Sequence, residues 1–182
     1  TPTPSTVLAI IPARIGTTRL PGKPLRLLGG LPLIVRVWER VCAMAVSETV
    51  VVATDAPEIA RVVEEAGGRA VMTRRDHPSG TDRVAEVASR PEFGDADVIL
   101  NVQGDEPFVP QSGVRGALSM VAGAHFAVGT AAAHAAEQIL ATPDVVKVVT
   151  ADDGRALYFS RAAIPALREA SDAPRRATLV RQ

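Results

Sequence analysis

Short apolar runs, many of them rich in β-branched residues, alternate along the chain with stretches of helical periodicity. The runs are almost continuously apolar instead of alternating with polar residues, which is typical of strands covered on both faces in a parallel sheet. They predict strands at 7–12, 49–54, 69–73, 97–103, 125–132 and 145–150.

The segments between these strands favour helices. In 31–46 the apolar spacing places Trp38 and Cys42 on one stripe, so both are expected in the core. Asp55 followed by Glu58 resembles a capping box at the start of the next helix. The helices are predicted at 31–46, 56–68, 81–89 and 111–122.

This repetition of strand, loop and helix predicts an α/β fold with a mainly parallel sheet, helices on both faces and right-handed crossovers. A length of 182 residues suggests a single domain over 1–182. Residues 166–182 are polar and basic, and they form no obvious element. In such sheets ligands bind beyond the carboxyl ends of the strands, so the loops at that edge are the place to look for chemistry.

Composition narrows the function classes. The formal net charge is +0 and aromatic residues make up 3% of the chain, which argues against nucleic acids and anionic membranes as partners. No apolar run approaches the roughly 20 residues that span a bilayer, and the first residues lack the features of a signal peptide. Cys42 is the single cysteine, so neither an internal disulfide nor a multi-cysteine metal site can form. These features predict a cytoplasmic enzyme.

The loop at 13–25 is strongly cationic. It contains Arg14, Arg19 and Lys23, and no acidic residue precedes Glu39. Two glycines would let backbone amides approach an anion closely. Neither the Walker spacing nor the dinucleotide fingerprint is present. From the residues alone, the loop is either a phosphate site or a solvated basic loop.

Two further loops carry candidate chemistry. In "QGDEP", Asp105 could hold Mg²⁺, which prefers one or two carboxylates with phosphate oxygens and water, or it could belong to an ordinary turn. Gln103 offers an amide to a hydroxyl group. The segment "HPSGTDR" (77–83) could contact a base edge, or it could simply start a helix with Thr81 or Asp82 as the cap.

Together these motifs resemble one enzyme family. "IIPARIGTTRLPGKPL", "TDAPEIA", "TRRDHPSGTDR", "NVQGDEPFVP", "VVKVV" and "ALYFSRAAIP" are similar, in order, to segments of the 3-deoxy-manno-octulosonate cytidylyltransferases, and the match runs from residue 7 to about residue 165. The resemblance implies a Rossmann-like nucleotidyltransferase domain. It also implies that CTP and 3-deoxy-manno-octulosonate (Kdo) give CMP-Kdo and pyrophosphate for lipopolysaccharide biosynthesis.

The resemblance also implies roles for individual residues. Arg14 and Lys23 would bind the phosphates, with Arg19 beside them, and Asp105 would bind Mg²⁺. Gln103 would lie between nucleotide and sugar, and Arg161 would face the sugar acid. Arg14, Lys23 and Asp105 would be the catalytic set. The nucleotide pocket would be lined by Ser79, Gly80, Thr81 and Arg83.

Family members continue beyond the last residue of this chain, and the resemblance implies that the additional part contributes to the sugar pocket, a second metal carboxylate and a homodimer contact. Two alternatives therefore remain open at the level of the sequence. The chain could be a CTP-binding but inactive module or fragment, or it could act on another sugar acid such as an acylneuraminate.

Overall fold

The computed structural model describes residues 6–16, 20–122, 126–134, 137–164 and 178–180. It divides into two compact units: residues 1–111 with 121–125, and residues 112–120 with 126–182. Two compact units can belong to one folding domain, so a single domain over 1–182 stays a prediction. In the described part of the chain, no helix is long and apolar enough to cross a membrane.

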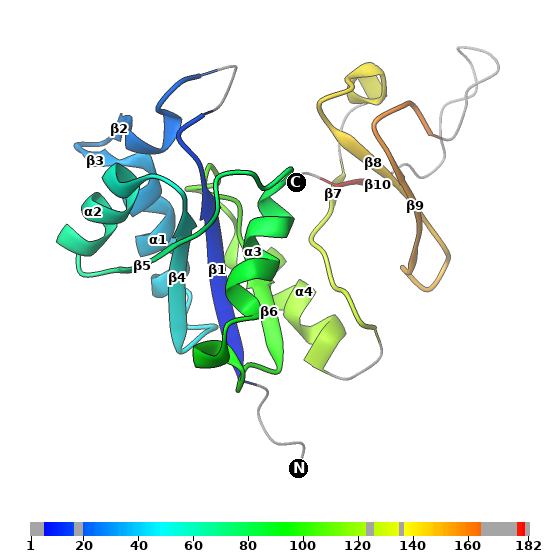
Figure 1. Ribbon diagram of the computed structural model, residues 1–182. Coiled ribbons are helices and arrows are strands. Elements are labelled where there is room, and N and C mark those ends of the chain that lie inside the picture. The colour runs from blue at the N-terminus through cyan, green and yellow to red at the C-terminus, as the bar shows by residue number, and fades with distance from the viewer. Residues whose placement is uncertain (1–5, 17–19, 123–125, 135–136, 165–177, 181–182) are drawn as a thin grey trace. The chain divides into compact units, whose positions relative to one another are not determined.

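The first unit is built on a four-stranded sheet in the order β5-β4-β1-β6 (Figure 1). All three pairings are parallel, as predicted, and Ile10 in the centre of β1 lies opposite Val51 on β4 and Asn101 on β6. The strands are β1 (Val7–Ala13), β4 (Thr49–Thr54), β5 (Arg69–Met72) and β6 (Val98–Asn101).

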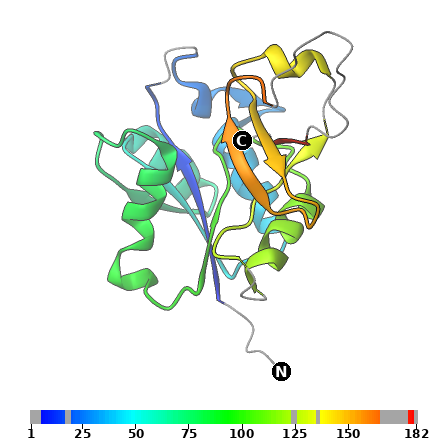
Figure 2. The same cartoon turned by 90° about the vertical axis from the view of Figure 1, so that its right-hand side faces the viewer.

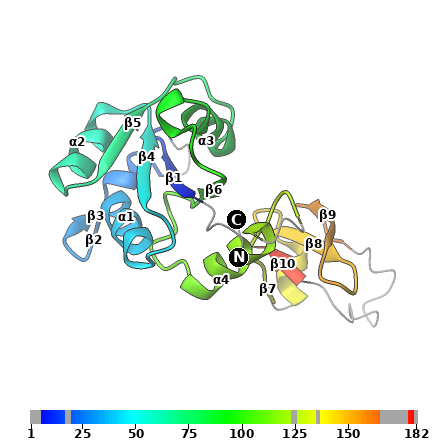
Figure 3. The same ribbon diagram turned by 90° about the horizontal axis from the view of Figure 1, so that it is seen from below.

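Helices cover both faces of this sheet, which confirms the predicted α/β class. Helices α1 (Leu33–Ala43) and α2 (Pro57–Glu65) lie on one face, and α3 (Gly80–Ala88) lies on the other (Figure 3). Alternate residues of β1 and β4 face α3, because side chains alternate along a strand. The core on the α3 side consists of Leu8, Ile10, Val51, Ala53, Val71, Val84, Val87 and Phe93.

The predicted apolar stripe of α1 is only partly correct. Cys42 is exposed and Trp38 is half-buried, so the expectation that both lie in the core is wrong. The buried residues of α1 are Ile34, Val35, Val37 and Val41. Helix α1 also begins later than predicted, because Leu31–Pro32 form the short strand β3.

Helix α2 does not begin with the predicted capping box. Its N-cap is Ala56, which makes no side-chain capping bond, and the Asp55 carboxylate pairs with Arg83 instead. The C-terminus follows the prediction. Gly67 has a φ of 85°, and the amides of Gly67 and Gly68 donate to the carbonyls of Glu64 and Val63, the pattern of a Schellman motif.

A hairpin that the sequence analysis missed follows β1. Strand β2 (Leu27–Leu28) pairs with β3 (Leu31–Pro32), and the two residues between them are Gly29 and Gly30 at φ of 58° and 85°. Two-residue hairpin turns favour glycine because they require such positive φ values. The short 3₁₀ helices of this unit are η1 (Lys23–Leu25) and η2 (Pro91–Phe93).

The second unit has an antiparallel sheet in the order β7-β10-β8-β9. Its strands are β7 (Ala133–His134), β8 (Val146–Thr150), β9 (Ala156–Ser160) and β10 (Thr178–Val180), and the yellow β8 and the orange β9 lie side by side in Figure 2. Helix α4 (Gln111–Ala122), most of which belongs to this unit, and η3 (Glu137–Ala141) complete its elements.

Several predictions for this part of the chain are wrong. Residues 126–132 of the predicted strand 125–132 form no strand, and residue 125 lies outside the described residues. Strand β8 was expected in the parallel sheet but pairs antiparallel with β9 and β10. Three residues of the supposedly unstructured tail form β10, and the other residues of 166–182 lie outside the described part.

Lys147 is the most unusual buried residue of the second unit. It lies on β8 and is 0% exposed. Its ammonium donates hydrogen bonds to the carbonyl oxygens of Thr142 at 2.9 Å, Val145 at 2.9 Å and Arg161 at 2.5 Å. A lysine has three donors, so the three carbonyls satisfy this buried cation completely.

Candidate functional site

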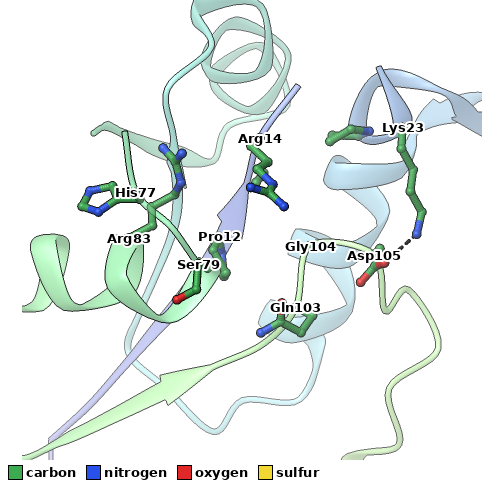
Figure 4. A pocket seen from close by; sticks show the side chains of 12 residues that line it. Pro12, Arg14, Lys23, His77, Ser79, Arg83, Gln103, Gly104 and Asp105 are labelled. Carbon is green, nitrogen blue, oxygen red and sulfur yellow. Dashed lines mark hydrogen bonds and ion pairs between the residues drawn. The ribbon is translucent and has the colours of Figure 1, made fainter. Parts of the chain in front are cut away.

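A pocket of about 230 Å³ lies at the carboxyl edge of the parallel sheet (Figure 4). Three loops that are distant in the sequence form it: the loop after β1, the segment between β5 and α3, and the loop after β6. This convergence is the one predicted from the strand order. The pocket is lined by Pro12, Ala13, Arg14, Lys23, Pro24, His77, Ser79, Gly80, Arg83, Gln103, Gly104 and Asp105.

The loop after β1 brings Lys23 to the pocket. Gly22 precedes η1 at a φ of 68°, a left-handed conformation that favours glycine, and Pro24 is buried beneath the turn. The Lys23 ammonium lies 2.5 Å from Oδ2 of Asp105. No acid stands near Lys23 in the sequence, yet folding supplies one from the loop after β6, which corrects the picture of a wholly unneutralised loop.

The loop after β6 lies directly against β1. A Cβ atom at Gly104 would be 2.6 Å from the carbonyl oxygen of Pro12, a distance that real Cβ atoms do not reach. Glycine at this position therefore allows the two backbones to pack against each other. On either side of Gly104, Gln103 donates from its amide to Asn101 Oδ1 at 3.3 Å and Asp105 faces Lys23.

Ser79 caps the helix that forms another wall of the pocket. Its hydroxyl oxygen accepts the amide of Asp82 at 3.2 Å, and the same hydroxyl donates to Asp82 Oδ2 at 2.5 Å. The cap is therefore Ser79, not Thr81 or Asp82 as expected, and α3 begins at Gly80. The positive end of the α3 dipole consequently opens at the pocket, where it favours an anion.

Arg83 lines the pocket, but its charge is already neutralised by a carboxylate of the protein. Its side chain is 3% exposed, it lies 3.3 Å from Oδ2 of Asp55, and it hydrogen-bonds to Thr73 Oγ1. The other carboxylate oxygen of Asp55 is buried without a hydrogen-bond partner. A buried arginine held by a carboxylate and a hydroxyl fixes the local structure, so Arg83 joins β4, β5 and α3 beneath the pocket.

The remaining charge of the pocket suits an anionic ligand. Arg14 is exposed, and no described carboxylate pairs with it. Figure 4 shows Arg14 between the side formed by His77, Ser79 and Arg83 and the side formed by Lys23 and Asp105. Cations, a helix N-terminus and a glycine loop in a single pocket form the arrangement that holds phosphate groups.

A divalent cation also fits the residues present. No group of three or more histidine, cysteine or acidic residues able to hold a metal occurs in the described part of the chain. Mg²⁺ does not need such a cage, because it is bound by one or two carboxylates together with substrate phosphates and water. Asp105 is half exposed at the pocket and is the carboxylate that could serve this purpose.

The predicted site residues divide into groups. Thr81 is exposed and does not line the pocket, Arg19 lies outside the described residues, and Arg161 belongs to the second unit. The Arg161 guanidinium donates to the carbonyl oxygens of Pro143 and Asp144, each at 3.1 Å. The others line the pocket together: Arg14, Lys23, Ser79, Gly80, Arg83, Gln103 and Asp105.

Sequence reasoning missed some of the lining residues. His77 belongs to the candidate segment 77–83 but was assigned no role of its own, and it both contacts Glu86 and lines the pocket. Pro12 and Gly104 were not singled out. Pro12 directly precedes the cationic loop 13–25, and Gly104 lies between Gln103 and Asp105. A signal for Gly104 was available, because a glycine directly after a buried strand often marks a close approach of two backbones.

Comparisons with known proteins agree on one family. The model of the cytidylyltransferase family matches residues 8–180. A curated 3-deoxy-manno-octulosonate cytidylyltransferase from Gemmatimonas aurantiaca is 61% identical over 176 residues, which make up 97% of this chain and 68% of that protein. The protein of the same name from Yersinia enterocolitica is 49% identical, over 89% of this chain and 65% of its own length. The chain thus spans about two thirds of the length of these relatives.

A solved structure is similar over the same range. It is CMP:2-keto-3-deoxy-manno-octonic acid synthetase complexed with CTP, with a TM-score of 0.83 and 40% sequence identity. The match covers 97% of this chain and 71% of the solved one. A cytidylyltransferase from Leptospira borgpetersenii, 23% identical with a TM-score of 0.53 over 64% of this chain and 48% of its own, shares the fold.

Proposed function

Because the chain belongs to the cytidylyltransferase family, we propose that its pocket binds CTP and that the protein uses CTP to activate Kdo, giving CMP-Kdo and pyrophosphate for lipopolysaccharide biosynthesis. One observation carries this proposal. A synthetase of this substrate class, complexed with CTP, matches the chain over 97% of its length at 40% identity. The three loops of the pocket all lie within the range that the family model matches.

The shape of the pocket supports a nucleotide with its phosphates at one end. Arg14 and Lys23 would bind the triphosphate. The third cation of the pocket, Arg83, is already paired with Asp55. Ser79 and Gly80, at the start of α3, would lie along the nucleoside. The Ser79 hydroxyl is occupied by Asp82, so the backbone here, rather than that hydroxyl, is the group most available to a base edge.

The reaction asks the protein chiefly for positioning and for charge neutralisation. The anomeric hydroxyl oxygen of Kdo attacks the α-phosphorus and its proton is released to solvent, while the bond to the bridging oxygen breaks and pyrophosphate leaves with the electron pair. Lys23 would stabilise the negative charge that grows on the leaving pyrophosphate, and Arg14 would hold the phosphates in place. A bound Mg²⁺ would supply further charge neutralisation, and Asp105 is the residue that would hold it.

On the sugar side, two residues enter the proposal. Gln103 would place its amide between nucleotide and sugar, since it lines the pocket next to Gly104. Arg161 would bind the sugar carboxylate. Its guanidinium donates to the carbonyl oxygens of Pro143 and Asp144, and among the described residues no carboxylate forms an ion pair with it. A cytoplasmic location and a homodimeric assembly accompany the proposal as predictions.

Two measurements on this chain test the proposal. Titration calorimetry with CTP and Mg²⁺ should detect binding, with UTP as the matched competitor. A pyrophosphate-release assay should then show turnover with CTP and Kdo, but not with CTP alone or with N-acetylneuraminate. Release with N-acetylneuraminate in preference to Kdo would reassign the sugar acid. Binding of CTP without release would favour a nucleotide-binding module, and the absence of CTP binding would refute the proposal.

A further inference from the structure

One side of α3 holds the segment that leads into the pocket. Arg83, Glu86 and Arg90 follow at spacings of three and four residues, so they lie on the same side of the helix and its C-terminal continuation. Each contacts a residue between Met72 and His77. Arg83 bonds the Thr73 hydroxyl, Arg90 bonds the Met72 carbonyl oxygen, and Glu86 contacts residues further along.

Glu86 makes the central contacts of this row. Its Oε2 accepts the backbone amide of Arg74 at 3.1 Å and lies 2.5 Å from Nε2 of His77. Its Oε1 accepts a hydrogen bond from Arg90 at 3.0 Å. The carboxylate is 21% exposed and the His77 side chain 4% exposed, so these bonds are partly shielded from water. Charge-assisted bonds of this kind are stronger than neutral ones.

The protonation of the pair follows from the surroundings. Burial alone would raise the pKa of Glu86, but hydrogen bonds from His77, the Arg74 amide and Arg90 lower it to about 2. The carboxylate is therefore ionised at neutral pH and can only accept hydrogen bonds. It follows that the Nε2 atom of His77 carries a proton directed at Glu86, which fixes the orientation of the ring.

Other hydrogen bonds hold only the two ends of this segment, and at its C-terminal end Ser79 bonds Asp82. The Thr73 amide donates to the Thr54 carbonyl oxygen at 2.8 Å and so continues the pairing of β5 with β4. In the described structure no amide of residues 74–79 donates to a main-chain oxygen. The last part of the segment nevertheless lines the pocket, through His77 and Ser79. The side chains of α3 must therefore supply its order.

We propose that Glu86 is a positioning residue: by holding the Arg74 amide and the His77 ring, it fixes the segment 73–79 as a wall of the pocket. Glu86 does not line the pocket itself, so it acts on a ligand only through this segment. The consequence for CTP affinity rests on the proposed function, whereas the ordering of the segment does not. A preorganised wall strengthens binding because the ligand need not order it.

The variants Glu86→Ala and Glu86→Gln separate this role from general stability. Alanine removes every acceptor, whereas glutamine keeps one side-chain oxygen that can still accept both the Arg74 amide and the His77 proton. Glu65→Ala is the matched control. It removes a carboxylate of an i,i+4 ion pair, with Arg61 at 3.5 Å, from the exposed surface of α2.

Amide hydrogen exchange of the full chain without ligand is the first measurement. In Glu86→Ala the Arg74 amide should exchange at least about tenfold faster, while the Thr73 amide, held by the sheet, keeps its rate. Glu86→Gln and Glu65→Ala should leave both rates close to wild type. Equal Arg74 exchange in Glu86→Ala and wild type, or equal acceleration at Thr73, would overturn the proposal.

Calorimetry with CTP is the second measurement. We expect Glu86→Ala to weaken CTP binding about tenfold, the equivalent of one lost charge-assisted hydrogen bond. Glu86→Gln should restore affinity to within about threefold. Unchanged CTP affinity in Glu86→Ala despite faster Arg74 exchange would refute the positioning role. If the wild type binds no CTP, the proposed function fails, while the exchange data still decide whether Glu86 orders the segment.

Discussion

Lys23 and Asp105 meet across 82 positions of sequence, and their contact governs what each residue can do. In the protein without ligand, the carboxylate occupies the place next to the ammonium where a phosphate would bind. Both side chains are substantially exposed, at 35% and 51%, so the pair contributes little to stability. A pair of this kind can separate at small cost when a nucleotide arrives.

For Lys23 we expect a larger effect on rate than on affinity. Lys23→Ala should slow transfer to Kdo about 100-fold and weaken CTP binding only severalfold, because the charge on the leaving pyrophosphate grows in the transition state. Lys23→Arg should not restore the rate, since a planar guanidinium does not replace a compact ammonium. Arg61→Ala on the surface of α2 is the control. Equal losses in rate and affinity would make Lys23 a simple phosphate anchor.

For Asp105 the expected effect depends on Mg²⁺. Asp105→Asn should remove most of the Mg²⁺-dependent gain in CTP affinity and in turnover, because a carboxylate ligand is lost. Without Mg²⁺ the variant should bind CTP at least as tightly as the wild type, because a negative charge has left the phosphate end of the pocket. Asp95→Asn, on an exposed turn, should behave like the wild type. Wild-type turnover of Asp105→Asn at limiting Mg²⁺ would favour the role of Asp105 in an ordinary turn.

At the scale of elements, α3 combines a capped start with a row of contacts to the segment before it. Ser79 caps the start of the helix, Arg83 pairs with Asp55 just after β4, and Glu86 bonds the Arg74 amide in the segment 73–79. Because the helix packs on the sheet through Val84 and Val87, the polar row is held at a fixed distance from the strand ends. Helix α3 thus fixes the position of the pocket wall relative to the sheet.

The pH dependence of stability should report on this element. The pKa of Glu86 is lowered in the folded protein to about 2 from an ordinary value of 4.5, so its contribution to folding is present above about pH 4.5. That contribution is lost as the pH falls from there toward about 2, when the carboxylate is protonated in the folded state too. Urea unfolding of wild type and Glu86→Ala should show a difference in the free energy of unfolding that shrinks over this range. A difference independent of pH would contradict the contacts of Glu86.

The sequence predicted elements best where burial leaves a simple pattern. Strands β1 and β4 are buried along most of their length, so their apolar runs were unambiguous. The run at 125–132 contains residues of the same kind, but Val128 is 81% exposed and the segment pairs with nothing in the described residues 126–132. Apolar composition alone cannot tell such a segment from a buried strand.

The site was predictable to the extent that topology determines it. Parallel strands end at one edge, so the loops with Arg14, Ser79 and Asp105 could be expected to converge. Pairing between those loops could not be read from local spacing. Lys23 with Asp105 and Asp55 with Arg83 are partners separated in sequence, and only the packing of the sheet and α3 brings each pair together.

At the scale of the whole molecule, the two compact units use different means to bury charge. The first unit pairs Arg83 with a carboxylate, whereas the second surrounds Lys147 with carbonyl oxygens. Lys147 ties the turn at 142–145 to the end of β9, because Arg161 follows that strand directly. The backbone that carries the proposed sugar residue Arg161 is therefore held by a lysine that lies in the interior.

Lys147→Met should destabilise the second unit by about 2–4 kcal/mol, because buried carbonyl acceptors lose their donor. Hydrogen exchange should accelerate for amides of β8 and β9, while the amides of β1 and β4 in the first unit keep their protection. Arg155→Met, which removes an exposed cation near the start of β9, should change neither set. Accelerated exchange throughout both units would mean that they unfold together.

The contact of Gly104 with the Pro12 carbonyl oxygen has a consequence for variation at this site. A saturation library at residue 104, selected for activity, should return glycine alone, since even alanine would force the backbones apart and cost about 1–3 kcal/mol. Gly116, on α4, has no atom within 4 Å of a Cβ position, and there alanine should be tolerated or stabilising by about 0.5–1 kcal/mol. Efforts to alter substrate preference should therefore vary the neighbours of Gly104 and keep this glycine. The backbones of β1 and of the loop after β6 are in contact here, so neither can move without the other.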